Sequence, residues 1–87
     1  MFPSHRQELE DRWREKVRLA CLRYEEAAKA FRATWHEHLD ERPMADPAFA
    51  IEQARKVESE ALAEYVRVLK IFSDLLLRGK IPEEPPE

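Results

Sequence analysis

The chain has 87 residues, of which 44 % are hydrophobic and 38 % are charged, and it contains a single glycine. A disordered chain is poorer in apolar residues and a β-rich chain needs more glycine at its turns, so this composition predicts an all-α protein. The net charge of −3 argues against a polybasic arm for nucleic acid or anionic lipid. A lone cysteine, Cys21, excludes an intramolecular disulfide framework and fits a reducing compartment.

The first predicted helix covers residues about 5–41. Ser4 followed by Gln7 is a capping-box pattern, in which the hydroxyl accepts from a backbone N–H and the amide reaches back. No helix breaker follows until Pro43, which disfavours helical geometry at the residue before it. Apolar residues at spacings of three and four predict one stripe facing a partner helix: Leu9, Trp13, Val17, Ala20, Tyr24, Ala27, Phe31 and Trp35.

The second predicted helix covers residues about 47–78. Asp46 supplies an N-cap acceptor, Pro47 stands at the first helical position, and Gly79 is placed to close the helix in a left-handed conformation. A connection of about five residues makes the two helices antiparallel neighbours, so the predicted fold is a helical hairpin. Its register predicts three neighbouring pairs: Tyr24 with Tyr65, Val17 with Phe72, and Trp13 with Leu75 or Leu76.

Two apolar stripes run along the second helix. The first, expected to lie against the first helix, consists of Ala50, Ala54, Val57, Ala61, Tyr65, Val68, Phe72 and Leu75. The second lies about 100° away around the helix axis and consists of Leu62, Val66, Leu69 and Leu76. Because a lone hairpin gives each helix one partner, the second stripe requires another subunit. The sequence therefore predicts a homo-oligomer, with a dimeric four-helix bundle favoured and the second stripe as its interface.

The end of the first helix carries the densest cluster of potential metal ligands, namely His36, His38, Asp40 and Glu41. His36 and Asp40 share one helix face, and His38 and Glu41 share another, so each pair offers two ligands to a divalent metal. The two imidazoles, however, lie about 200° apart around the helix and do not easily share one ion. We therefore expect a solvated helix end, with these four residues as weak metal candidates and no cofactor.

Catalytic and nucleic-acid sites have little support in the sequence. Cys21 has no histidine within hydrogen-bond reach in the predicted helix, and no glycine-rich phosphate loop is present, so we expect a protein that is not an enzyme. A basic arc on the first helix is interrupted by Asp11 and Glu25, which makes nucleic acid an unlikely partner. The residues of this basic arc are Arg14, Arg18, Lys29 and Arg32.

The two ends of the chain also carry expectations. Residues 81–87 are acidic and rich in proline, so we expect a disordered tail that is dispensable for folding. The opening residues lack the apolar run of a signal peptide, and no stretch approaches the roughly 20 apolar residues that span a bilayer. We therefore expect a cytoplasmic protein without a membrane partner.

The leading functional prediction is a non-enzymatic, self-associating helical bundle that serves as a protein–protein interaction or scaffold module. Its first partner is a second copy of the chain, and another protein is the further partner that such a surface would serve. Two alternatives belong to other classes. One is a small nucleic-acid-associated regulator that uses the basic arc, and the other is a metal-binding bundle that uses the His36–Glu41 segment.

Overall fold

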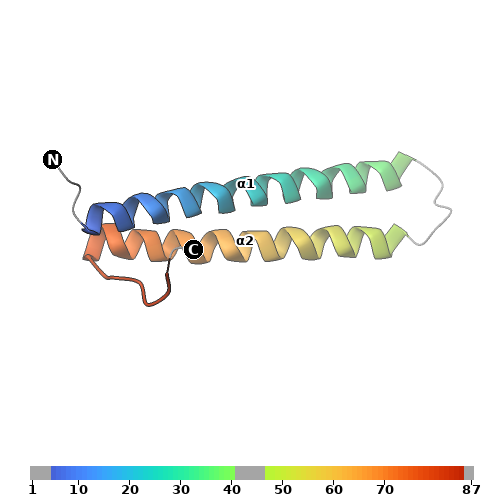
Figure 1. Ribbon diagram of the computed structural model, residues 1–87. Coiled ribbons are helices and arrows are strands. Elements are labelled where there is room, and N and C mark those ends of the chain that lie inside the picture. The colour runs from blue at the N-terminus through green and yellow to red at the C-terminus, as the bar shows by residue number, and fades with distance from the viewer. Residues whose placement is uncertain (1–4, 41–46, 86–87) are drawn as a thin grey trace.

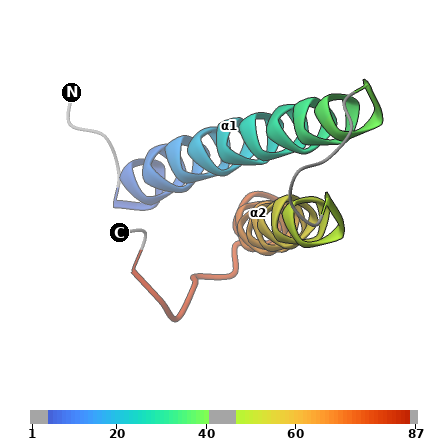
Figure 2. The ribbon, with the colours of Figure 1, turned by 90° about the vertical axis from the view of Figure 1, so that its right-hand side faces the viewer.

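Two α-helices, α1 (His5–Asp40) and α2 (Pro47–Arg78), make up the fold. The computed structural model describes residues 5–40 and 47–85, with side-chain surroundings for 5–37 and 48–85. The helices run side by side in opposite directions (Figure 1), and their axes are inclined to each other (Figure 2). The molecule is a rod of 62 × 23 × 19 Å. The all-α hairpin predicted from the sequence is therefore confirmed.

The carboxyl end of α2 is closed by a glycine and by an arginine from the other helix. Gly79 has a φ of 66°, and its N–H donates to the carbonyl oxygen of Leu75 at 3.1 Å. The N–H of Lys80 donates to the carbonyl oxygen of Asp74 at 3.2 Å. The Arg6 guanidinium, from the first turns of α1, donates to the same Leu75 carbonyl at 3.2 Å. Its positive charge also lies beside the negative end of the helix dipole, which stabilises this end of the hairpin.

The core lies in the half of the hairpin that holds the chain termini. Trp13, Val68 and Leu75 are fully buried there, with Ala20 almost so. The small Ala20 side chain lets the two helices approach closely. Partly buried apolar side chains surround this cluster: Leu9, Val17, Tyr65, Ile71 and Phe72. The Lys16 ammonium lies 5.0 Å from the centroid of the Trp13 ring and covers it from the solvent side.

The contacts between the helices agree with the predicted register, and Val17 and Phe72 both pack against the buried cluster. The rings of Tyr24 and Tyr65 stack with their centroids 6.3 Å apart and their planes 22° apart. Trp13 and Leu75 belong to the same buried cluster. These contacts follow from the short connection and the antiparallel direction of the helices alone.

The half of the hairpin nearest the connection is packed less closely. Trp35 and Val57, which the sequence places in the stripes facing the partner helix, are exposed. For Trp35 the physical reason lies in the facing residues of α2, because Ala50 and Ala54 carry only a methyl group and fill little of the space between the helices. Neither helix, over its described residues, has an apolar stretch long enough to cross a bilayer.

Candidate functional site

The most prominent surface feature is a strip of large aliphatic side chains on α2. We call it the apolar face of α2, and it consists of Leu62, Val66, Leu69 and Leu76. Their exposed fractions are 41 %, 56 %, 39 % and 39 %, in that order. Side chains of this kind are normally buried, and scattered single exposures are common, but four in one line form a patch of the sort that marks an interaction site.

Helix geometry explains why α1 leaves this face uncovered. Val68 and Leu75 point at α1 and are completely buried. Leu69 and Leu76 each follow one of them by a single residue, which turns them by about 100° away from α1. A single neighbouring helix reaches only one side of α2, so the second stripe remains in solvent. The structure thus brings the four predicted interface residues onto one face and leaves that face open in the single chain.

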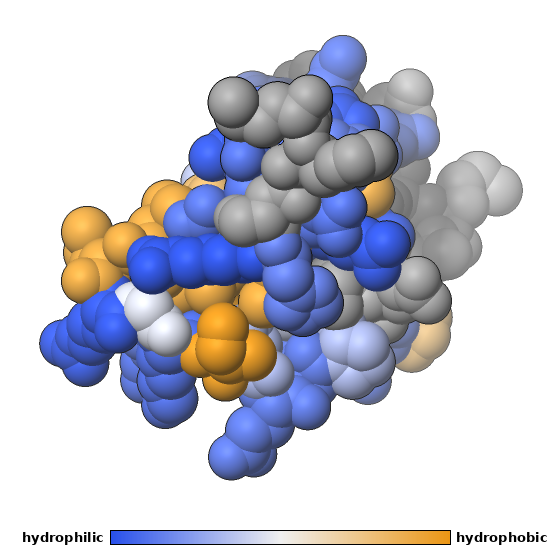
Figure 3. All heavy atoms as spheres, turned by 60° about the vertical axis from the view of Figure 1, so that its left-hand side comes forward, coloured by the Kyte–Doolittle hydropathy of each residue, from blue (hydrophilic) through white to orange (hydrophobic). Residues whose placement is uncertain are grey.

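The dimensions of the whole chain also indicate that a single copy leaves an unusually large surface exposed. The radius of gyration is 18.1 Å, whereas a compact domain of this length has about 12 Å. The accessible surface is 7071 Å², against about 5,400 Å² for a globular monomer of this mass. Figure 3 shows orange apolar side chains reaching the surface between the blue polar ones. A single chain therefore exposes much more surface than a self-contained domain does.

Cys21 and Glu25 of α1 form a small polar group with Tyr65 of α2. The Cys21 thiol donates to a carboxylate oxygen of Glu25 at 3.6 Å. A hydrogen bond with Cys21 raises the pKa of the Tyr65 phenol, and the electrostatic interaction with Cys21, burial and the negative charge of Glu25 act in the same direction. Tyr65 therefore stays a neutral hydrogen-bonding group over the physiological pH range. The thiol pairs with a carboxylate, which is a weaker base than the imidazole that activates a catalytic cysteine.

The basic arc is partly neutralised by acidic neighbours on the same helix. Arg14 pairs with Asp11 at 2.9 Å, and its guanidinium lies 5.6 Å from the centroid of the Phe72 ring. Arg18 forms a two-pronged ion pair with Glu15, whose pKa is lowered by that hydrogen bond. The other two members, Lys29 and Arg32, are exposed on α1.

Only one of the four metal candidates has described side-chain surroundings. His36 is exposed near the end of α1, while the side chains of His38 and Asp40, and the whole of Glu41, lie outside the described residues. Within the part of the chain that the structure describes, no group of three or more His, Cys, Asp or Glu residues is arranged to hold a metal ion. The metal hypothesis therefore stays a prediction.

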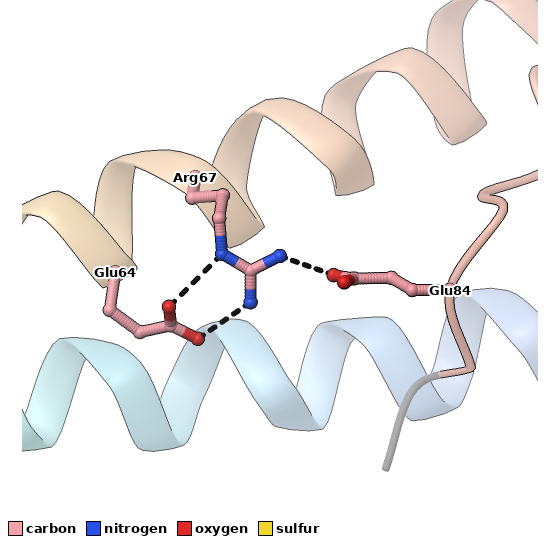
Figure 4. A network of polar contacts seen from close by, with 3 residues as sticks. All are labelled: Glu64, Arg67 and Glu84. Atoms are coloured by element: carbon pink, nitrogen blue, oxygen red, sulfur yellow. Dashed lines mark hydrogen bonds and ion pairs between the residues drawn. The ribbon is translucent and has the colours of Figure 1, made fainter.

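The C-terminal segment makes a contact that sequence analysis does not predict. Arg67 donates to both carboxylate oxygens of Glu64, at 2.9 and 3.0 Å, and pairs on its other side with Glu84 (Figure 4). The chain after Gly79 turns back along α2 to bring Glu84 there (Figure 1). No motif marks this contact, because it depends on where the turn at Gly79 directs the chain. Whether residues 82–87 are dispensable for folding stays a prediction.

Comparison with known proteins adds no function to this picture. No family model matches the sequence, and neither the curated proteins nor the solved structures contain a significant match.

Proposed function

We propose that the protein is a non-enzymatic, self-associating helical module, in which two copies pack the apolar faces of α2 together as a dimeric four-helix bundle. Such a bundle would serve as a scaffold that presents its remaining surface to another protein. One observation carries the proposal. Four large aliphatic side chains lie in a single line on α2, and each is between 39 % and 56 % exposed in the single chain.

The size of the exposed surface favours a second copy as the occupant of the apolar face. Each chain has about 1,700 Å² more surface than a compact protein of its mass. A standard protein–protein interface buries about 800 Å² on each partner, so a dimer contact fits well within this excess. A second copy always presents a matching apolar face, and a two-fold axis brings the same patch of both subunits together.

A charge placed within the apolar face tests the proposal. We expect wild type to sediment as a dimer of two 10.3 kDa chains. The Leu69→Glu variant should dissociate, because an ionised carboxylate in a desolvated contact costs several kcal/mol without a compensating partner. The variant should also lose helicity on dilution, since a lone hairpin has a small core. Sedimentation velocity and circular dichroism over a concentration series measure both effects.

Leu22→Glu is the matched control. Leu22 is 42 % exposed in the single chain, close to the 39 % of Leu69, but it lies about 180° from Trp13 on the outer side of α1. We expect this variant to remain dimeric. A wild-type protein that is monomeric and fully helical at micromolar concentration would overturn the proposal. Dissociation of the Leu22→Glu variant alone would place the interface on α1 instead.

A further inference from the structure

The apolar face of α2 contains a repeat that defines how a second copy can dock. Leu62, Leu69 and Leu76 are spaced seven residues apart, and three residues before each of them stand Ser59, Val66 and Ser73, also seven apart. These two lines form the alternating three- and four-residue spacing of a helix–helix seam. Five of the six residues lie on the exposed side of α2, and Ser73 is half-buried. The seam therefore alternates between large and small side chains.

A parallel and an antiparallel partner helix bring different side chains of the seam into contact. A parallel partner would bring each residue against its own copy, so that serine faces serine and leucine faces leucine. The serine layers would then be underpacked, and each cavity of methyl size or larger costs stability. An antiparallel partner brings each residue of one line against a residue of the other line. Every leucine then packs over a smaller side chain, and all layers have similar volume.

We infer that α2 packs against α2 of a second copy in antiparallel orientation, with the two-fold axis between Val66 and Leu69. In this register Leu62 lies opposite the partner subunit's Ser73, and Leu76 lies opposite the partner subunit's Ser59. The two central residues pack across the axis. A buried serine hydroxyl can donate to a carbonyl of the preceding turn of its own helix, so these layers leave no polar atom unpaired.

Charged residues mark the N-terminal limit of the seam. One heptad before Ser59 and Leu62, the same two positions are occupied by Glu52 and Arg55. Charged residues at both seam positions end the apolar contact there. The contact thus runs from Ser59 to Leu76, about 26 Å along the helix. Because its centre lies on the C-terminal side of the middle of α2, the ends of the hairpins nearest the connection project beyond the shared region in opposite directions.

This inference rests on the proposed self-association and is tested by site-specific cross-linking. Cys21 is first replaced by alanine, and single Ser59→Cys and Leu76→Cys variants are made in that background. Each variant is treated with a short bis-maleimide, alone and after the two have been unfolded together and refolded as a mixture. Sedimentation of the reduced proteins establishes that each variant is dimeric before the reagent is added.

We expect a cross-linked dimer in the mixture only. Within one variant the two cysteines lie about 26 Å apart along the helix, beyond the reach of the reagent, whereas Ser59→Cys and Leu76→Cys are adjacent across the seam. Cross-linking of each variant alone would show a parallel dimer and overturn the inference. Dimeric variants that do not cross-link even in the mixture would also overturn it, while leaving self-association intact. Chains that sediment as monomers would refute both.

Discussion

The two halves of the hairpin use the same kind of sequence pattern with different results. In the half with the termini, Trp13 packs against Val68 and Leu75, and all three are fully buried. In the half with the connection, Trp35 occupies the corresponding line of α1 but is 44 % exposed. The difference lies in the facing residues of α2, which are large aromatic and aliphatic side chains in one half and mostly alanines in the other. An apolar stripe on one helix is buried only where the facing helix supplies enough volume to cover it.

The contacts that stabilise the hairpin are concentrated at one of its ends. The fully buried side chains, the Gly79 closure and the Arg6 contact with α2 all lie in the half with the termini. The apolar face of α2 extends along this same half from Leu62 to Leu76. The most completely buried side chains of a chain thus lie beneath the surface that we propose for the second copy, and the other half lies outside that contact.

The largest predicted effect is on the free energy of unfolding, and it is measured by comparing alanine substitutions of the two tryptophans. Trp13→Ala should lower the free energy of unfolding by about 3–5 kcal/mol, because it opens a large cavity in the core. Trp35→Ala should change it by less than about 0.5 kcal/mol, as at most exposed sites. Urea unfolding at one fixed chain concentration measures both, since the stability of a dimer depends on concentration. Equal losses from the two substitutions would show that the connection half is covered in the assembled protein.

Most of the architecture follows from local signals in the sequence. Both helices lie within the predicted ranges, α2 ends at Arg78 as predicted, and Gly79 takes the left-handed conformation that its place after Arg78 predicts. The two predicted N-caps, Ser4 and Asp46, lie outside the described residues. Helix periodicity and a short connection are sufficient for these features, because each depends on neighbours a few residues away.

The remaining features depend on contacts between distant parts of the chain. Arg6 and Leu75 are 69 positions apart, and nothing in either segment marks the pair. The Arg67–Glu84 contact depends on the direction in which the chain leaves Gly79. The uneven burial of Trp13 and Trp35 depends on which residues of α2 face them. Periodicity places a residue on a face, but the volume opposite that face becomes known only when the helices are assembled.

A smaller effect tests the closure of α2 in the half with the termini. Gly79→Ala should lower the free energy of unfolding by about 1–2 kcal/mol, because a residue with a Cβ is strained in a left-handed conformation. The added Cβ would lie 3.5 Å from Arg6 Nη1, an ordinary contact, so the cost comes from the backbone. Thermal unfolding measures the loss. Gly79→Asn should recover part of it, since asparagine tolerates this conformation. Identical losses for both variants would point to side-chain crowding instead.

The smallest effect concerns the ion pair between Glu64 and Arg67, which tests whether polar contacts add to the apolar packing. The hydrogen bond from Arg67 lowers the pKa of the Glu64 carboxyl, and the charges of Arg67, Lys16 and Arg23 act in the same direction. A carboxyl with a lowered pKa in the folded protein stabilises it at every pH above the unfolded value of about 4.3, and that stabilisation is lost as the pH falls through the folded value. Both side chains of the pair are more than one-third exposed, so its contribution should stay below about 1 kcal/mol.

We therefore expect Glu64→Gln to be slightly less stable than wild type at neutral pH and to match it in acid. The difference should be constant from about pH 5 upward, where the Glu64 carboxylate is ionised in both the folded and the unfolded chain. It should shrink as the pH falls and disappear once the carboxyl is protonated in the folded protein as well. Added salt should also reduce it at neutral pH, because exposed charges are screened. Urea unfolding of both proteins over a pH series gives the comparison. A difference that persists at the lowest pH would have to come from packing of the side chain, because by then wild type and variant carry the same charge at this position.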